Sequence, residues 1–161
     1  MLTPLGRSTS LAEPPRPAAP APRHPSSAGR FVHWVTDPVA ATVPQVRARV
    51  RDALDDWRVP GELADVLLLA VSELVGNVVR HAAAGRMRVG VTRGGGWIRL
   101  EVADQGAGLP RLPLPRAEAD LESEYGRGLL IVQLLAAESG GELSVVAGES
   151  GKSVRLRVPA P

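Results

Sequence analysis

The sequence contains no cysteine, and its 161 residues include a single lysine, Lys152. The absence of cysteine excludes disulfide bonds and metal sites built from thiolates. The formal net charge is only +2, which is too small to favour nucleic-acid binding. No apolar run reaches the roughly 18 residues that a membrane-spanning helix needs, and the N-terminus lacks the apolar core of a signal peptide. We therefore expect a soluble, cytoplasmic protein that contacts neither membranes nor nucleic acid directly.

The N-terminal segment differs in composition from the rest of the chain. Residues 1–29 are dominated by proline, alanine and serine, and they contain almost no large apolar side chains. Such a segment cannot bury enough surface to offset its ordering entropy, so we predict a disordered or polyproline-like tail. A passive tail is favoured over a partner-binding one. The ordered domain is expected at residues 30–161, because the 44% hydrophobic content of the chain can build a core.

The hydrophobic pattern of residues 30–161 predicts an α+β fold. Helical spacing and strand alternation indicate, in chain order, a strand at 31–35, helices at 41–57 and 63–83, strands at 87–92 and 97–104, a helix at 129–138, and strands at 142–147 and 153–158. A long irregular stretch at 106–124, with a weak helix at 116–121, is expected to be a loop or lid. Because strands and helices cluster rather than alternate, we predict a two-layer sandwich. Its mixed, mostly antiparallel sheet is covered on one face by helices.

A carboxylate and an amide stand among apolar positions of the predicted helix at 63–83. Glu73 and Asn77 are four residues apart, so they stack on one helix face. Val66 and Ala70 lie on the same side at helical spacing. Placing polar groups there costs stability unless something needs them, and a local rule broken in this way usually marks a functional site. The helix alone also allows a simpler interpretation, in which Glu73 lies at the edge of a solvated face.

Two glycine-rich motifs follow along the chain. Residues 104–110 read Asp-Gln-Gly-Ala-Gly-Leu-Pro at the end of a strand whose alternation aims Asp104 toward the covered side of the sheet. Residues 126–129 read Gly-Arg-Gly-Leu and open the apolar helix at 129–138. Each motif alone is weak, because the first is typical of a turn and the second of a tight turn into a helix. His81 by itself is typical of a helix C-terminus, where the helix dipole favours it.

In this order and spacing, the motifs resemble those of the GHKL ATPase superfamily, which has the Bergerat ATP-binding fold. The sequence is most similar to the anti-sigma factor serine kinases of bacteria. Residues 72–82 resemble the N box of that family, residues 104–110 its G1 box and residues 126–132 its G2 box. Residues 151–154 fit its final strand, and the likeness covers residues 30–158. The sequence departs from the family at Gly76, where relatives often carry threonine or alanine, and at Ser139-Gly140, where tryptophan often precedes the glycine.

The resemblance implies a site for ATP and Mg²⁺. Asp104 would accept a hydrogen bond from the adenine amino group, and the glycines Gly106 and Gly108 would let the backbone approach the ring. Asn77 would supply an amide oxygen to Mg²⁺, and Glu73 would position and deprotonate the attacking hydroxyl as the catalytic base. Free N–H groups at a helix N-terminus favour phosphate. The residues implied there are Gly126, Arg127, Gly128 and Leu129.

The resemblance also implies an activity and partners. The first hypothesis is an ATP-dependent serine/threonine kinase that phosphorylates a STAS-type anti-anti-sigma protein and/or sequesters a sigma factor, with water as the alternative acceptor. The second is a nucleotide-regulated protein-binding module without kinase activity. The ATPase half of a sensor histidine kinase is disfavoured, because the upstream segment is proline-rich and His24 lies in no helical pattern. Relatives often dimerise through the sheet, so a homodimer is expected.

Overall fold

The computed structural model describes residues 29–81, 85–106, 127–148 and 151–161, and the predicted tail and lid lie outside these ranges. The elements in chain order are β1 (Arg30–Thr36), α1 (Thr42–Asp56), α2 (Gly61–His81), β2 (Met87–Gly94), β3 (Trp97–Asp104), α3 (Arg127–Glu138), β4 (Glu142–Gly148) and β5 (Gly151–Pro159). Every predicted helix and strand within the described ranges is present. The weak helix at 116–121 lies outside them. Among the described helices, none is long and apolar enough to cross a membrane.

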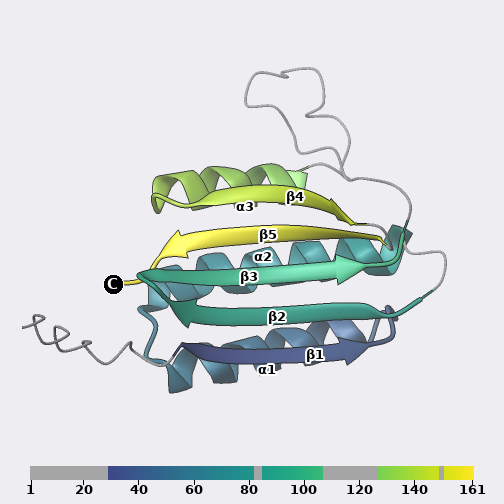
Figure 1. The fold of residues 1–161 in the computed structure, drawn as a ribbon, viewed down its shortest axis with the longest axis horizontal. Helices are drawn as coiled ribbons and strands as arrows, with labels where there is room; N and C mark the ends of the chain where they lie inside the picture. Colours follow the sequence, from purple (N-terminus) through teal and green to yellow (C-terminus); the bar gives the residue numbers. More distant parts are fainter. Residues whose placement is uncertain (1–28, 82–84, 107–126, 149–150) are drawn as a thin grey trace, which may run out of the picture.

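The strands form one sheet, and the helices lie on one of its faces (Figure 1). The strand order is β1-β2-β3-β5-β4, and all four pairings are antiparallel. The predicted two-layer α+β sandwich is therefore confirmed, with a sheet that is antiparallel at every described pairing. Gly95 and Gly96 connect β2 to β3 with φ of 60° and 77°. A two-residue hairpin turn with two positive φ values matches the right-handed twist of its strands, which explains the glycines there.

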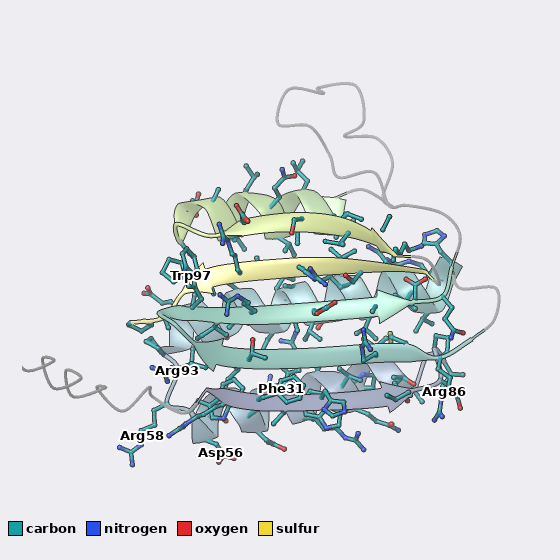
Figure 2. The ribbon with its side chains drawn as sticks, in the orientation of Figure 1. Phe31, Asp56, Arg58, Arg86, Arg93 and Trp97 are labelled. Atoms are coloured by element: carbon teal, nitrogen blue, oxygen red, sulfur yellow. The ribbon has the colours of Figure 1, made fainter. Side chains whose placement is uncertain are left out.

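The core lies between the sheet and the helices. Alternate residues of the central strands are fully buried on the covered face; examples are Val89, Leu100 and Leu156. The opposing surface comes mainly from α2, whose buried positions recur at helical spacing. The other sheet face is open and carries exposed apolar side chains, among them Phe31 of β1 (Figure 2). The alternation of the strands thus fixes which side chains face the helices.

Candidate nucleotide site

The described residues of the three motifs lie at one end of the sandwich. α2 ends at His81 and β2 begins at Met87, whose neighbour Arg88 pairs with Ala103 of β3. The C-terminal part of α2 therefore lies at the same end of the sheet as Asp104. α3 runs toward the start of β4 at the opposite end, so its N-terminus also lies at the Asp104 end (Figure 1).

The N-box residue Glu73 lies directly against the start of α3. A methyl group at Gly128 would overlap the Glu73 carboxylate and would lie 2.9 Å from its Cγ atom. Glu73 and Asn77 are both half-buried on α2. The glycine is therefore needed for this approach, and it places the carboxylate beside the first N–H groups of α3. Such groups have no partner within the helix.

The second N-box residue, Asn77, is engaged by a neighbour on the same helix. Its Oδ1 atom accepts a hydrogen bond of 2.6 Å from Nη2 of Arg80. This is the oxygen that the sequence predicts for Mg²⁺, so the Arg80 guanidinium and the ion would share or compete for its two lone pairs. Arg80 follows Asn77 by three residues and shares its helix face. The sequence motif includes Arg80, but the predicted set of site residues omits it.

Asp104 is oriented by contacts at the end of β3. It is 8% exposed, and its Oδ1 atom accepts a hydrogen bond of 2.6 Å from the Gly106 N–H. The ammonium of Lys152 on β5 lies 3.6 Å from the same oxygen. A methyl group at Gly106 would lie 2.7 Å from that oxygen and 3.3 Å from the Lys152 Nζ. Glycine at position 106 thus permits a close packing of backbone, carboxylate and ammonium.

A contact from α1 supports α2 next to Glu73. Nη1 of Arg47 donates hydrogen bonds to the Leu68 carbonyl at 2.6 Å and to Oγ of Ser72 at 2.7 Å. The Ser72 hydroxyl itself donates to the Leu68 carbonyl at 2.8 Å. Sequence reasoning missed Arg47, because nothing in the spacing of the first helix distinguishes this arginine from its neighbours.

Part of the predicted site lies outside the described residues. This is the case for Gly108, for Gly126 and for the rest of the predicted lid. Arg127 is placed as the first residue of α3, and its side chain is outside the description. The Leu129 side chain is 7% exposed and belongs to the core, so only the backbone of this residue is left for the predicted phosphate site.

Two hollows on the described surface belong to the sheet rather than to the helical layer. One, of about 440 Å³, is bordered by Asp104 and Lys152 and extends over the open face to Val35 and Arg155. The other, of about 330 Å³, lies farther along that face beside Phe31. Neither is lined by Glu73, Asn77 or α3. They are therefore distinct from the part of the predicted site that lies on α2 and α3.

The described residues fit an adenine nucleotide with Mg²⁺. Asp104 supplies a nearly buried acceptor, and Asn77 and Glu73 supply hard oxygen atoms of the kind Mg²⁺ binds. The N-terminus of α3 supplies backbone N–H groups and the positive end of a helix dipole. Added methyl groups would fill the close approaches at Gly106 and Gly128. The described residues that the sequence predicts for base, metal and phosphate thus lie at one end of the sandwich.

This fold and this arrangement define a GHKL-type ATPase domain. Residues 37–158 match the family model of the histidine kinase-like ATPase domain, and the chain belongs to this family. The matched range covers both helices of the site and all but the first strand of the sheet.

The relatives found by sequence are histidine kinases. The chain is 36% identical over 103 residues to sensor histidine kinase PdtaS of Mycobacterium tuberculosis, covering 60% of this chain and 19% of that protein. It is 32% identical over 117 residues to blue-light-activated histidine kinase 2 of Erythrobacter litoralis, covering 69% of this chain and 32% of that protein. The chain thus spans about a fifth to a third of the length of these curated relatives.

Solved structures agree on the fold. The RsbU and RsbW domains of Rv1364c from Mycobacterium tuberculosis superpose with a TM-score of 0.61 at 21% identity, covering 81% of this chain and 32% of that one. The EL346 blue-light-activated histidine kinase of Erythrobacter litoralis gives a TM-score of 0.51 at 27% identity, covering 70% of this chain and 40% of that one. The predicted membership of the GHKL superfamily is confirmed.

Proposed function

We propose that the chain binds ATP with Mg²⁺ and transfers the γ-phosphoryl group to a serine of a STAS-type anti-anti-sigma protein in the cytoplasm. Sequestering of a sigma factor, by a homodimer of this chain, belongs to the same proposal. The observation that carries it is the approach of Glu73 to Gly128, which brings a carboxylate to the helix N-terminus expected to hold phosphate. The motifs of the anti-sigma factor serine kinases supply the choice of partner.

Each residue has a role in this proposal. Asp104 accepts a hydrogen bond from the adenine amino group, and the backbone N–H groups at the start of α3 bind the phosphates. Asn77 would hold Mg²⁺, which would neutralise phosphate charge when bound. Glu73 accepts the proton of the serine hydroxyl. The serine oxygen bonds to the γ-phosphorus while the bond between the γ-phosphorus and the β–γ bridging oxygen breaks. ADP leaves with that oxygen.

A histidine acceptor is the second candidate, because the curated relatives are named as histidine kinases. The same residues could serve a serine or a histidine as phosphoryl acceptor, since phosphoryl transfer depends mainly on positioning and charge stabilisation. The acceptor is therefore decided by the partner that docks. The two products differ in stability, because a phosphoserine ester survives acid whereas a phosphohistidine is hydrolysed in it.

The test is incubation of the protein with labelled ATP, Mg²⁺ and a cognate STAS protein. We expect an acid-stable label on the partner that disappears with Glu73→Ala, while ATP binding is retained. An acid-labile label would favour the histidine acceptor. Absence of label on every STAS partner would contradict the serine-kinase proposal.

A nucleotide-regulated binding module remains the alternative to a kinase. In that case ATP and ADP change the affinity for a protein partner without any transfer. The distinguishing variant is Glu73→Gln, which keeps the size of the side chain and removes its charge. A module predicts that nucleotide-dependent partner binding is unaffected by this substitution, whereas a kinase predicts that transfer stops.

A further inference from the structure

The open face of the sheet carries a surplus of positive side chains. The described helices cover only the other face, so solvent reaches the side chains of this one (Figure 1). On the described strands, the charged residues of the open face are four arginines and two glutamates: Arg88, Arg99, Arg155, Arg157, Glu101 and Glu142. They occupy positions that alternate with the buried ones. The distribution of their ion pairs decides what the face can bind.

Two of the four arginines are paired within the face. Nη2 of Arg155 lies 3.2 Å from the Glu101 carboxylate on the neighbouring strand. Nε of Arg157 lies 2.9 Å from the Glu142 carboxylate, and its guanidinium carbon lies 4.7 Å from the centre of the Trp97 ring. These contacts engage both glutamates of the face and two of its arginines.

The other two arginines, Arg88 and Arg99, have no counter-charge among the described residues. Arg99 lies directly opposite Arg157 in the register of β3 and β5, and like charges in such a pair are destabilising. Arg88 lies between Val35 of β1 and Ala103 of β3, which are both uncharged. Both arginines are exposed. The face therefore presents two positive charges that an anionic partner would stabilise.

Each of these arginines lines one of the two hollows of the open face. Arg88 lines the hollow of about 440 Å³, and Arg99 lines that of about 330 Å³. Glu101 and Arg155 line both, so the two hollows adjoin at this ion pair. Arg99 is level with Thr92, four residues beyond Arg88 on β2, which separates the two arginines by about 13 Å along the strands. One elongated occupant would reach both.

A glycine without a local cause lies between the two arginines. Gly90 occupies the middle of β2 without a positive φ, and a methyl group added there would meet nothing nearer than the Val32 carbonyl oxygen at 3.8 Å. Such a glycine weakens a strand, and it is typical of a position that another chain approaches closely. On the adjacent strand β1, Phe31 is 59% exposed and Val35 is 49% exposed. The face thus offers apolar contact together with charge.

We propose that the open face is a docking surface for an acidic amphipathic helix of a partner protein. Its carboxylates pair with Arg88 and Arg99, and its apolar side chains cover Phe31 and Val35. The occupant is a helix, because every inner strand of the sheet is already paired on both sides. An extended segment on this face would leave its own backbone N–H and C=O groups without partners, whereas a helix pairs them internally. Docking there needs no bound nucleotide.

A second copy of the chain fits this face less well. A copy would bring the same arginines, and its glutamates on the face are already engaged by its own Arg155 and Arg157. Two such faces would therefore meet with a surplus of positive charge on each side, which costs binding energy. A partner that brings its own carboxylates removes this repulsion.

The test uses a designed peptide as the probe and measures its binding by fluorescence anisotropy without nucleotide. The probe is an alanine-rich helix of about 20 residues with two glutamates eight positions apart, a rise of about 12 Å. Leucines at the first, fourth and seventh positions after the first glutamate share its helix face. A matched peptide has glutamine in place of both glutamates. We expect weak, saturable binding of the acidic peptide, at least about fivefold tighter than that of the glutamine peptide.

The double variant Arg88→Met/Arg99→Met removes both charges. Since neither arginine forms an ion pair with a described residue, the fold should be retained. Binding of the acidic peptide should weaken by about fivefold or more, to the level of the glutamine peptide. Arg49→Met/Arg51→Met is the matched control, because it changes the net charge equally on the exposed surface of α1 and should leave binding unchanged. Equal weakening by both double variants, or no binding of the acidic peptide to the wild type, would overturn the inference.

Gly90→Val separates this occupant from a second copy. The valine side chain fills the space above the middle of β2, and it should not lower the melting temperature because valine favours strands. Binding of the acidic peptide should weaken by about tenfold or more, while sedimentation should show the oligomeric state of the wild type. Retained peptide binding, or a wild-type dimer that this variant converts to monomers, would overturn the inference. Failure of the wild type to bind ATP would contradict only the function proposed above.

Discussion

Replacement of Gly128 by alanine tests the contact between the N box and the start of α3. The added methyl group would overlap the Glu73 carboxylate and lie 2.9 Å from its Cγ atom. No positive φ is recorded at Gly128, so alanine causes no backbone strain there. The substitution therefore acts through Glu73, which must move away from the helix N-terminus.

Two opposing effects set the expected stability of Gly128→Ala. Glycine to alanine stabilises a helix interior by about 1 kcal/mol, and by less in the first turn. Overpacking costs about 1–3 kcal/mol, and here the lower end applies because the displaced atoms belong to a flexible side chain. The net change is between about zero and 1 kcal/mol of destabilisation. At about 3 °C of melting temperature per kcal/mol, the loss is up to about 3 °C.

Urea and thermal unfolding of a double-mutant cycle measure the effect. Gly76→Ala in α2 is the matched control, because its added methyl group meets nothing nearer than an Arg80 nitrogen at 3.5 Å. It should stabilise the protein by about 1 kcal/mol. In a Glu73→Ala background, Gly128→Ala should become stabilising, which gives a coupling of about 1 kcal/mol or more. Equal effects of Gly128→Ala in both backgrounds would refute the contact.

Three further predictions concern α1, β5 and the base. Arg47→Met removes two hydrogen bonds to α2 and should lower the free energy of unfolding by about 1–2 kcal/mol. Arg49 is exposed, so the control Arg49→Met should change this free energy by less than about 0.5 kcal/mol. Gly151→Ala places a methyl group 3.0 Å from the Asp104 carbonyl carbon, at a residue whose φ of 144° strains any side chain. It should lower the free energy of unfolding by about 2–4 kcal/mol. Gly61→Ala, with open space around the added methyl group, should be nearly neutral. Asp104→Ala should weaken ATP and ADP equally, by about tenfold or more in calorimetry, because the base is common to both; full affinity would contradict its assignment.

The secondary structure was predictable because its signals are local. The alternation of residues 97–104 correctly predicted that Asp104 lies on the face toward the helices. The spacing in α2 correctly predicted that Glu73 and Asn77 share one helix face. The boundaries differ by one or two residues, as helix ends usually do.

The contacts between distant segments were not predictable from such patterns. The pairing of Asp104 with Lys152 depends on the insertion of β5 between β3 and β4, and the strand order is not encoded in local periodicity. The hydrogen bond from Arg80 to Asn77 depends on a side-chain conformation. Arg47 needs the packing of α1 on α2 before its role is visible. The family resemblance predicted that the three motifs form one site, whereas the contacts between their residues became known only from the fold.

The central claim is that the end of β3, the second half of α2 and the start of α3 bind one nucleotide together. Hydrogen–deuterium exchange with and without Mg·ATP tests it on the unmodified protein. Simultaneous slowing of exchange in residues 73–81, 104–106 and 127–130 is the predicted result. Slowing in only one of these segments, or in none while ATP is bound, would contradict it.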